Sequence, residues 1–269
     1  MSGRRHFLAL SAGCALCGCS GAMHRLPSAD ASRIQLAATE VTAEAALPRR
    51  VVGDHEARAT IARVQRRLQD VAVATCHEMG VGVCGWHVHV LADRSMNASA
   101  GPGGVIAIHH GIVEHARNDE EVALVLGHEI GHQAANHIAN SQRNVQVGAV
   151  IGALLLGAAA AYLGAGSPYS GQIVRDATEL GGNLGAVVGR ISFSREQERE
   201  ADYIAAVILH RAGYDLDRAR GFLLTLARAS TRMQSGMFDT HPAGPERVAA
   251  WDLAVEEIRR SGGALPARA

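Results

Sequence analysis

The strongest constraint on this chain is the sequence His-Glu-Ile-Gly-His at residues 128–132. Residues four apart share one face of a helix, so His128 and His132 project together and can bind one metal ion. Glu129 is displaced by about 100° around the helix axis and can lie beside a metal-bound water. Because the chain has 14 histidines, chance alone would give this pattern in about 4% of such chains, and its surroundings decide its meaning.

The residues around this motif predict a capped and buried helix. Asn118 can cap it, and Glu121 can close a capping box. The following stretch "EVALVLG" is apolar and predicts packing in a core. Buried polar side chains are costly without partners, which favours a pair of metal ligands. The alternative is two core histidines that bond to backbone carbonyls.

A catalytic zinc site with two histidines needs a third protein ligand and an open position for water. A second polar helix, predicted over about 197–211, offers Glu198 and Asp202 four residues apart on one face. We interpret Glu198 as the third ligand and Asp202 as an acceptor that orients a zinc-bound histidine. Glu196 and Glu200 are interpreted as part of a solvated face with ion pairs.

The "HEIGH" motif followed by "FSREQEREAD" at 193–202 resembles the HtpX-type gluzincin metallopeptidases, including their periplasmic lipoprotein relatives. The resemblance covers most of residues 55–255, and the family's Glu-x-x-x-Asp motif falls on Glu198 and Asp202. It implies one Zn²⁺ per chain. The expected fold is α+β, a mostly helical zincin-like domain with a small β-sheet beside the HExxH helix.

The same resemblance implies further site residues. Asn97 and the pair Gly103 and Gly104 match an Asn and a Gly-rich strand before the zinc helix, which marks a substrate strand. A later His-Pro with an Arg six residues after the His matches His241 and Arg247. As catalytic candidates, His241 could approach the metal or the substrate, and Arg247 could steady the oxyanion. The alternative for the His-Pro is a turn that leads into the next helix.

Other patterns supply the scaffold. Apolar residues at helical spacing predict a helix over 56–75, and alternation predicts a strand over 86–91 with His87 and His89 on its wetter face. A second strand is predicted over 105–110. Extended substrate could bind to it at 105–108 by strand addition.

The N-terminus is interpreted as an export signal, because two arginines precede an apolar run that is too short for a lasting membrane anchor. The "LCGC" sequence resembles a bacterial lipobox in which Cys19 is lipidated. An ordinary signal peptide cleaved near Ala22 is the alternative. The predicted organisation is a lipoprotein-type signal peptide at 1–18, a flexible tether at 19–50, a metallopeptidase domain at 51–262 and a tail at 263–269.

Two further features bear on export and on membranes. Cys76 and Cys84 could form a disulfide in an oxidising periplasm. Residues 144–174 hold no charged side chain, and the segment 145–166 is long enough to span a bilayer. Because this segment is rich in Ala and Gly, we favour a buried or membrane-facing helix near the active site over a span.

A formal net charge of zero and 4% aromatic residues give no support to nucleic-acid binding. The resemblance implies a zinc-dependent endopeptidase that hydrolyses unfolded or misassembled envelope proteins. The expected location is the periplasm, with a lipid anchor in the outer membrane. Two alternatives are a zinc-binding chaperone or assembly factor with little or no proteolysis, and a purely structural lipoprotein.

Overall fold

The computed structural model describes residues 21–43, 48–164, 167, 169–189, 193–230, 241 and 243–269. The chain divides into two compact units, and each is described by itself. The larger unit comprises Gly21–Ile138 and Ser192–Ala269, and it carries both sequence motifs. The smaller one contains Ala139–Ile191.

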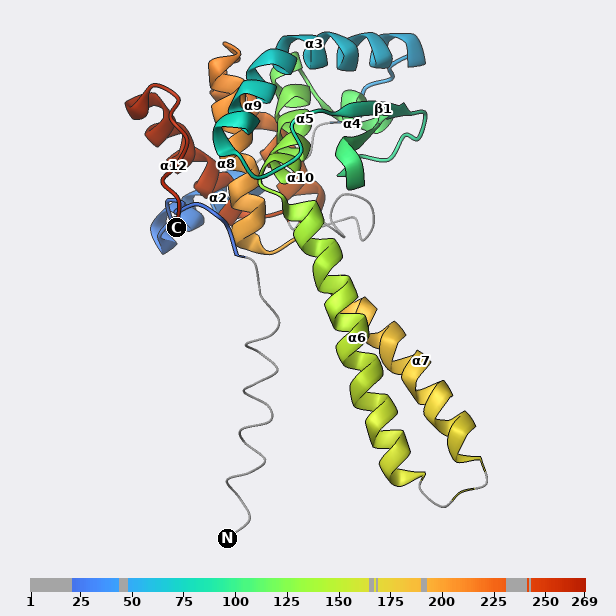
Figure 1. The fold of residues 1–269 in the computed structure, drawn as a ribbon. Helices are drawn as coiled ribbons and strands as arrows, with labels where there is room; N and C mark the ends of the chain where they lie inside the picture. The colour runs from blue at the N-terminus through green and yellow to red at the C-terminus, as the bar shows by residue number, and fades with distance from the viewer. Residues whose placement is uncertain are drawn as a thin grey trace. The chain divides into compact units, whose positions relative to one another are not determined.

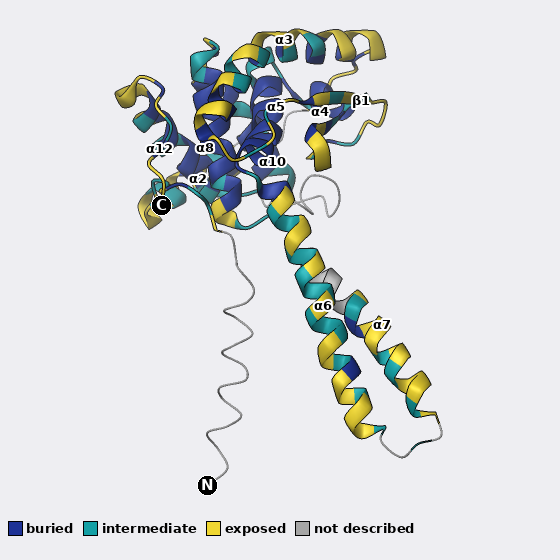
Figure 2. Cartoon of the chain, in the orientation of Figure 1, coloured by how far each residue is buried: buried dark blue, intermediate teal, exposed yellow. Residues whose placement is uncertain are grey.

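Two buried helices form the centre of the larger unit (Figures 1 and 2). Helix α5, Asp119–Ala134, and helix α8, Arg195–Arg211, pack directly on each other. Their approach is close because Gly131 faces α8: a Cβ atom on it would lie 2.7 Å from the carbonyl oxygen of Ala201. This contact brings the HExxH motif beside the Glu-x-x-x-Asp motif.

Further helices enclose this pair. The amphipathic helix expected over 56–75 is confirmed as α3, and Asn118 caps α5 through its side chain as predicted. The carboxylate of Glu121 accepts from the backbone N–H of Arg117 rather than from that of the cap residue. The other helices of this unit are α2 (Ala31–Ala43), α3 (Asp54–Met79), α4 (His110–His115), α9 (Leu216–Ala219), α10 (Gly221–Ser230) and α12 (Pro245–Ser261).

A small mixed sheet lies beside α5. Its strands are β1 (His87–Leu91), β2 (Ala98–Ala100) and β3 (Val105–His109), in the order β1-β3-β2. Strand β3 is parallel to β1 and antiparallel to β2, and a 3₁₀ turn at Pro102–Gly104 joins β2 to β3. The predicted α+β, mostly helical fold is therefore confirmed, as are the exposed positions of His87 and His89 on β1.

The sheet order corrects one expectation. Strand addition of a substrate at 105–108 is wrong, because β3 is the central strand and both of its edges are already paired. Periodicity identifies a strand but not its neighbours. Within the described sheet, β1 and β2 are the edge strands, and β2 is the one that contacts α5 directly.

The N-terminal segment also differs from its prediction as a flexible tether. Residues 31–43 form α2, which packs on α12 and α10 and buries Ala37 and Val41. Residues 263–269 are not a free tail either, since Arg268 forms a β-bridge with His24. The small apolar face of α2 gave no dominant period in the sequence, so only the tertiary contacts reveal the helix.

Cys76 and Cys84 form a disulfide, with their Cα atoms 5.5 Å apart. The bond joins the end of α3 to the segment that precedes β1. The pairing considered from the sequence is therefore present in the fold.

The smaller unit is a helical hairpin. Helix α6, His137–Leu163, and helix α7, Ser170–Gly189, lie side by side (Figure 1) and approach closely at Gly181, where a Cβ atom would lie 2.2 Å from the carbonyl oxygen of Gly152. Among the described helices, α6 alone is long and apolar enough to cross a membrane, and 11% of its most apolar window is buried. Of the two positions expected for this segment, the buried one is wrong, because much of the hairpin is exposed (Figure 2) and its exposed residues include Leu154, Leu155, Tyr162 and Leu163. A membrane-facing position stays a prediction.

Candidate metal centre

Four metal-binding side chains meet in the interior of the larger unit. His128 and His132 come from α5, Glu198 comes from α8, and His241 precedes α12. All four are buried, and one potential ligand atom of each lies within 4.8 Å of the others. The structure therefore brings together the three ligands predicted from the sequence and adds His241 to them.

The distances suit a single small cation. The Nε2 atoms of His128 and His132 are 3.0 Å apart, and Glu198 Oε1 lies 3.3 Å from His132 Nε2. His241 Nδ1 lies 3.2 Å from His128 Nε2. In a tetrahedral zinc site with ligand bonds of 2.0–2.1 Å, the ligand atoms are separated by about 3.3–3.4 Å. These three separations match this spacing within about 0.4 Å.

The protonation of the rings also favours a metal ion. His128 Nδ1 lies 2.8 Å from Asp202 Oδ1, so this nitrogen carries the proton and donates it to the carboxylate. A metal ion would replace the proton on His128 Nε2, and the lone pair on this nitrogen would then point at the other donors of the cluster. Imidazole nitrogens and a carboxylate are the donor set that zinc prefers, so the residues present fit this ion.

Glu129 lies next to these ligands and makes no hydrogen bond with the described residues. Both of its carboxylate oxygens are buried and have no hydrogen-bond partner among the described residues. His241 Nε2 is 3.7 Å from Glu129 Oε1. An isolated buried carboxylate is costly, and a metal-bound water beside it would satisfy it.

Arg247 lies against two carboxylates of the site, and its predicted role at an oxyanion stays a prediction. Its guanidinium donates to both oxygens of Asp202, at 2.9 and 2.8 Å, and pairs with Glu198 Oε2 at 2.9 Å. The side chain is buried together with these carboxylates. The geometry therefore assigns Arg247 to holding Asp202 and Glu198 in place.

The electrostatics of the cluster are dominated by its carboxylates. Burial alone would lower the pKa of His128, but Glu198 and Asp202 outweigh it and raise the pKa to about 9. Burial alone would raise the pKa of Glu198, but His241, Arg247 and His128 hold it well below its usual range. Glu198 is therefore ionised at neutral pH, and so is Asp202, whose pKa Arg247 and His128 lower against the effect of burial.

Glu200 differs from its prediction as a solvated residue. It is fully buried, with Oε2 2.9 Å from His137 Nε2 and Oε1 2.5 Å from His24 Nδ1. Burial alone would raise its pKa, but the hydrogen bonds from His137 and His24 outweigh it and lower the pKa to about 2. The prediction failed because α8 is covered on nearly every side, whereas Glu196 is exposed as expected.

Four predicted residues remain, namely Asn97, Gly103, Gly104 and Cys19. Asn97 directly precedes β2, and its carbonyl accepts from the backbone N–H of His109. Gly103 and Gly104 form the turn between β2 and β3 with φ of 70° and 80°, a conformation that favours glycine. No contact places these residues against the metal ligands, and Cys19 lies outside the described residues.

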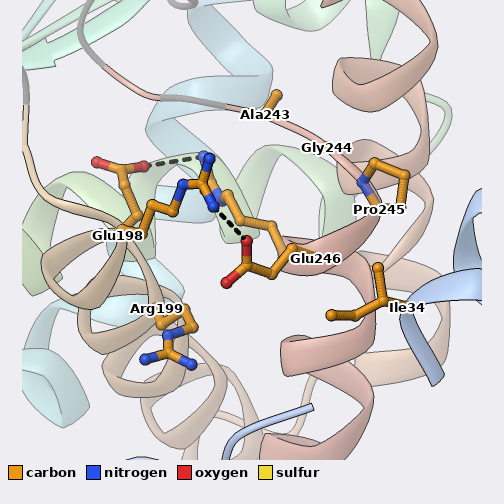
Figure 3. Close-up of a pocket in the computed structure, with 9 residues that line it drawn as sticks. Ile34, Glu198, Arg199, Ala243, Gly244, Pro245 and Glu246 are labelled. Carbon is orange, nitrogen blue, oxygen red and sulfur yellow. Dashed lines mark hydrogen bonds and ion pairs between the residues drawn. The ribbon is translucent and has the colours of Figure 1, made fainter. Parts of the chain in front are cut away.

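A cavity of about 260 Å³ adjoins the cluster from the side of α8 (Figure 3). Glu198 and Arg247 line it together with Ile34 of α2, and an ion pair of 3.1 Å between Arg195 and Glu246 stands at its border. This volume is below that of a typical pocket for a drug-sized ligand and closer to that of a few side-chain groups.

An HExxH helix packed on a helix with Glu-x-x-x-Asp, with the donors buried together, defines a zinc metallopeptidase domain. Residues 59–254 match peptidase family M48. The chain belongs to this family, whose metallopeptidases are zinc enzymes. The resemblance stated from the sequence motifs is thereby confirmed.

Relatives of known name extend this finding. The mitochondrial metalloendopeptidase OMA1 of Arabidopsis thaliana is 30% identical over 65% of this chain and 32% of its own length. The β-barrel assembly-enhancing protease of Escherichia coli is 31% identical over 61% of this chain and 33% of its own. Metalloprotease LoiP of the same organism is 28% identical over 72% and 73%. The chain thus spans about a third of the length of the first two relatives.

Proposed function

We propose that this chain is a zinc-dependent endopeptidase of the bacterial cell envelope that hydrolyses unfolded or misassembled proteins. One observation carries the proposal. His128, His132 and Glu198 converge in a buried site, and beside them lies the buried carboxylate of Glu129, which has no hydrogen bond among the described residues. A purely structural role would leave this donor set unexplained, because buried polar groups without partners are costly.

The chemistry follows from the roles of these residues. When bound, zinc would lower the pKa of a coordinated water and polarise the scissile carbonyl. Glu129 accepts the proton of the attacking water and passes it to the leaving amine. Asp202 fixes the tautomer and orientation of His128, and Arg247 holds Asp202 and Glu198 in register.

His241 is assigned to blocking the resting site in this scheme. Its Nδ1 lies among the ligand atoms, where a fourth protein ligand would leave no coordination position for water. Its Nε2 lies 3.7 Å from Oε1 of Glu129, the proposed general base. We assign His241 to the resting site, and hydrolysis requires its side chain to move away.

The substrate class rests on the sheet and on the relatives. Strand β2 has one unpaired edge and contacts α5, so an extended peptide can add to it by backbone hydrogen bonds, beside Asn97 and the turn at Gly103 and Gly104. Recognition of this kind depends little on side chains and suits unfolded chains. The name of the E. coli relative, a β-barrel assembly-enhancing protease, supports envelope proteins as substrates.

The location rests on the N-terminal sequence. We assign residues 1–18 to a lipoprotein-type signal peptide and Cys19 to lipidation, with the protein anchored in the outer membrane and facing the periplasm. The disulfide between Cys76 and Cys84 supports an oxidising compartment. The exposed apolar side chains of α6 and α7 support a location next to lipid.

Cys19→Ser is expected to abolish labelling by a radioactive fatty acid and to release the protein into the soluble periplasmic fraction. Continued labelling would contradict the assignment.

The catalytic assignment is tested with the purified chain and a reduced, carboxymethylated protein as unfolded substrate. Cleavage should stop in chelator and return with added zinc. Glu129→Gln should bind zinc normally and lose about 10²–10⁴-fold in rate, the usual contribution of a general base. Glu120→Gln is the control. It makes the same substitution nine positions earlier on α5, and this variant should cleave normally.

Two outcomes would overturn parts of this proposal. Cleavage that survives Glu129→Gln removes the assigned mechanism. A folded, zinc-loaded chain that cleaves neither the substrate nor itself, but prevents the aggregation of unfolded protein, favours the chaperone function instead.

A further inference from the structure

The second zinc-binding histidine has an unusual set of neighbours. His132 is fully buried, and its Nδ1 lies 3.0 Å from Nδ1 of another buried histidine, His137. The ring of Phe193 covers one face of His132, with the ring centroids 3.9 Å apart. Hydrogen bonding through Nδ1 leaves His132 Nε2 directed at the metal-binding cluster.

Behind His137 the contacts continue to a carboxylate. His137 Nε2 lies 2.9 Å from Glu200 Oε2, and Glu200 Oε1 lies 2.5 Å from His24 Nδ1. The backbone N–H groups of Met23 and His24 donate to the same carboxylate, at 2.9 and 3.0 Å. The three side chains of His24, His137 and Glu200 are all buried.

The protons in this series of hydrogen bonds can be assigned in only one consistent direction once His132 binds a metal through Nε2. His132 must then carry its proton on Nδ1 and donate it to His137 Nδ1. A neutral His137 carries its own proton on Nε2 and donates it to Glu200. His24 and two backbone N–H groups also donate to Glu200, so each nitrogen and oxygen from His132 Nδ1 to the Glu200 carboxylate has a matching partner.

We infer that His137, Glu200 and His24 are positioning residues that hold the metal ligand His132 through this chain of hydrogen bonds. The inference rests on the proposed zinc site and extends it. Metal-binding histidines commonly donate their second N–H to a carboxylate, and loss of that partner weakens metal affinity 10–100-fold. His128 meets Asp202 directly, whereas His132 reaches Glu200 through one additional imidazole.

The alternative is a structural role, in which Glu200 only attaches the N-terminal segment to α8. This role predicts lower stability but an unchanged metal site in the folded protein. The positioning role predicts a change at the metal itself. Zinc affinity and the visible spectrum of bound cobalt(II) separate the two, because neither requires hydrolysis and both are measured on folded protein.

The experiment compares the full chain with Glu200→Gln, His137→Asn and the double variant, by competition for zinc with a chromophoric chelator. Glu200→Gln should weaken zinc binding about tenfold and shift the cobalt(II) absorption. His137→Asn keeps an acceptor for His132 but breaks the link to Glu200, so it should lose a similar factor. Because both substitutions act through the same series of hydrogen bonds, the loss of zinc affinity in the double variant should be much smaller than the product of the two single losses.

Glu196→Gln is the matched control, since it removes the same charge from an exposed position on the same helix and should leave affinity and spectrum unchanged. If Glu200→Gln does not fold, His24→Gln replaces it in the same cycle. Wild-type affinity and spectrum in folded variants, or losses that multiply in the double variant, would overturn the inference. A wild-type chain that binds no zinc would instead overturn the proposed function.

Discussion

Asp202 Oδ1 lies 2.8 Å from Nδ1 of His128, and the guanidinium of Arg247 donates to both oxygens of the same carboxylate. The carboxylate therefore holds a metal ligand on one side and is itself held on the other. Burial alone would raise the pKa of Asp202, but Arg247 and His128 outweigh it and lower the pKa, so the group stays ionised.

The first prediction concerns this contact. Asp202→Asn should weaken zinc binding about 10–100-fold, because the amide no longer fixes the tautomer of His128 as a carboxylate does. Competition with a chelator of known affinity measures the change. Asp217→Asn, at an exposed acid that pairs with Arg259, is the control and should bind zinc normally. Equal affinities in the two variants would contradict the role of Asp202.

The second prediction concerns His241. His241→Ala removes a fourth donor from the ligand cluster and opens the space beside Glu129, so zinc affinity should fall while the rate of peptide hydrolysis rises. Zinc content and the rate of cleavage of a fluorogenic peptide are measured on the same preparation, at a zinc concentration that saturates both proteins. A loss of activity at full zinc occupancy would show that His241 acts in the reaction and does not block it.

The sequence predicted those parts of the site that depend on local spacing. His128 and His132 are four apart on one helix, and Glu198 and Asp202 repeat this spacing on another, so each pair shares a face whatever the rest of the fold does. That the two pairs meet depends on the close packing of α5 and α8. The spacing does not show this packing, and it was expected from the family resemblance.

The sequence failed where a residue's environment is made by distant segments. An acidic helix with Glu200 in it looks solvated, but distant segments that carry His24 and His137 cover that position. In the same way, periodicity located β3 but could not show that strands on both sides leave it no free edge. The order of strands in a sheet and the segments that cover a helix are set by long-range packing, so no single short stretch of sequence shows them.

The third prediction tests the close packing of the two motif helices. In Gly131→Ala the new methyl would meet the backbone of Ala201, with the carbonyl oxygen at 2.7 Å and Cα at 3.0 Å, so α8 must move. Overpacking of this kind costs about 1–3 kcal/mol. Because Glu198 moves with α8, zinc affinity should fall as well as stability, measured by urea unfolding and chelator competition.

Gly127→Ala is the matched control on the same helix face. Its methyl would meet the Cδ1 atom of Leu209 at 3.0 Å and the Cβ atom of Ala205 at 3.3 Å, and a side-chain end can move aside more easily than backbone. The gain in helix propensity, about 1 kcal/mol, partly offsets this contact. If both variants bind zinc equally well, the close approach at Gly131 does not set the distance between the ligands.

The fourth prediction concerns α2, the helix found in the segment expected to be a tether. Arg220 donates to both oxygens of Glu40 at 2.6 and 2.7 Å and also pairs with Asp252 of α12. Glu40→Gln should lower the free energy of unfolding at pH 7 by about 1 kcal/mol, a small value because the Glu40 side chain is 42% exposed. Urea unfolding measures it.

The pH dependence of this pair has a definite sign. The hydrogen bond from Arg220 is the largest cause that holds the pKa of Glu40 below its usual 4.5, against burial, which raises it. A carboxylate with a lowered pKa in the folded state stabilises the fold above its unfolded pKa, and this contribution is lost as the pH falls through the folded value. The gap between wild type and Glu40→Gln should therefore close below about pH 4. Glu256→Gln breaks the exposed pair with Arg33, and its free energy of unfolding should equal that of wild type both at pH 7 and below about pH 4.

The last prediction concerns the disulfide, whose position links the scaffold to the end of the zinc helix. Cys76 and Cys84 close a short loop, and directly before Cys84 the chain packs against the end of α5, where the backbone N–H of Val83 donates to the carbonyl of Gln133. A Cβ atom on Gly82 would lie 2.2 Å from that same carbonyl oxygen, so the segment has no room to shift.

Replacing both cysteines by alanine should lower the free energy of unfolding by about 2–3 kcal/mol, from the loop-closure entropy of a loop this short. For a domain of this size the midpoint of thermal unfolding should fall by about 5–10 °C. Zinc affinity should stay within about twofold of wild type, because His128 and His132 precede the end of α5 and are held by α8, Asp202 and His137. Reductant should destabilise the wild type to the level of the double variant and leave that variant unchanged. A large loss of zinc affinity at temperatures where the variant is folded would mean that the end of α5 helps to position the ligands.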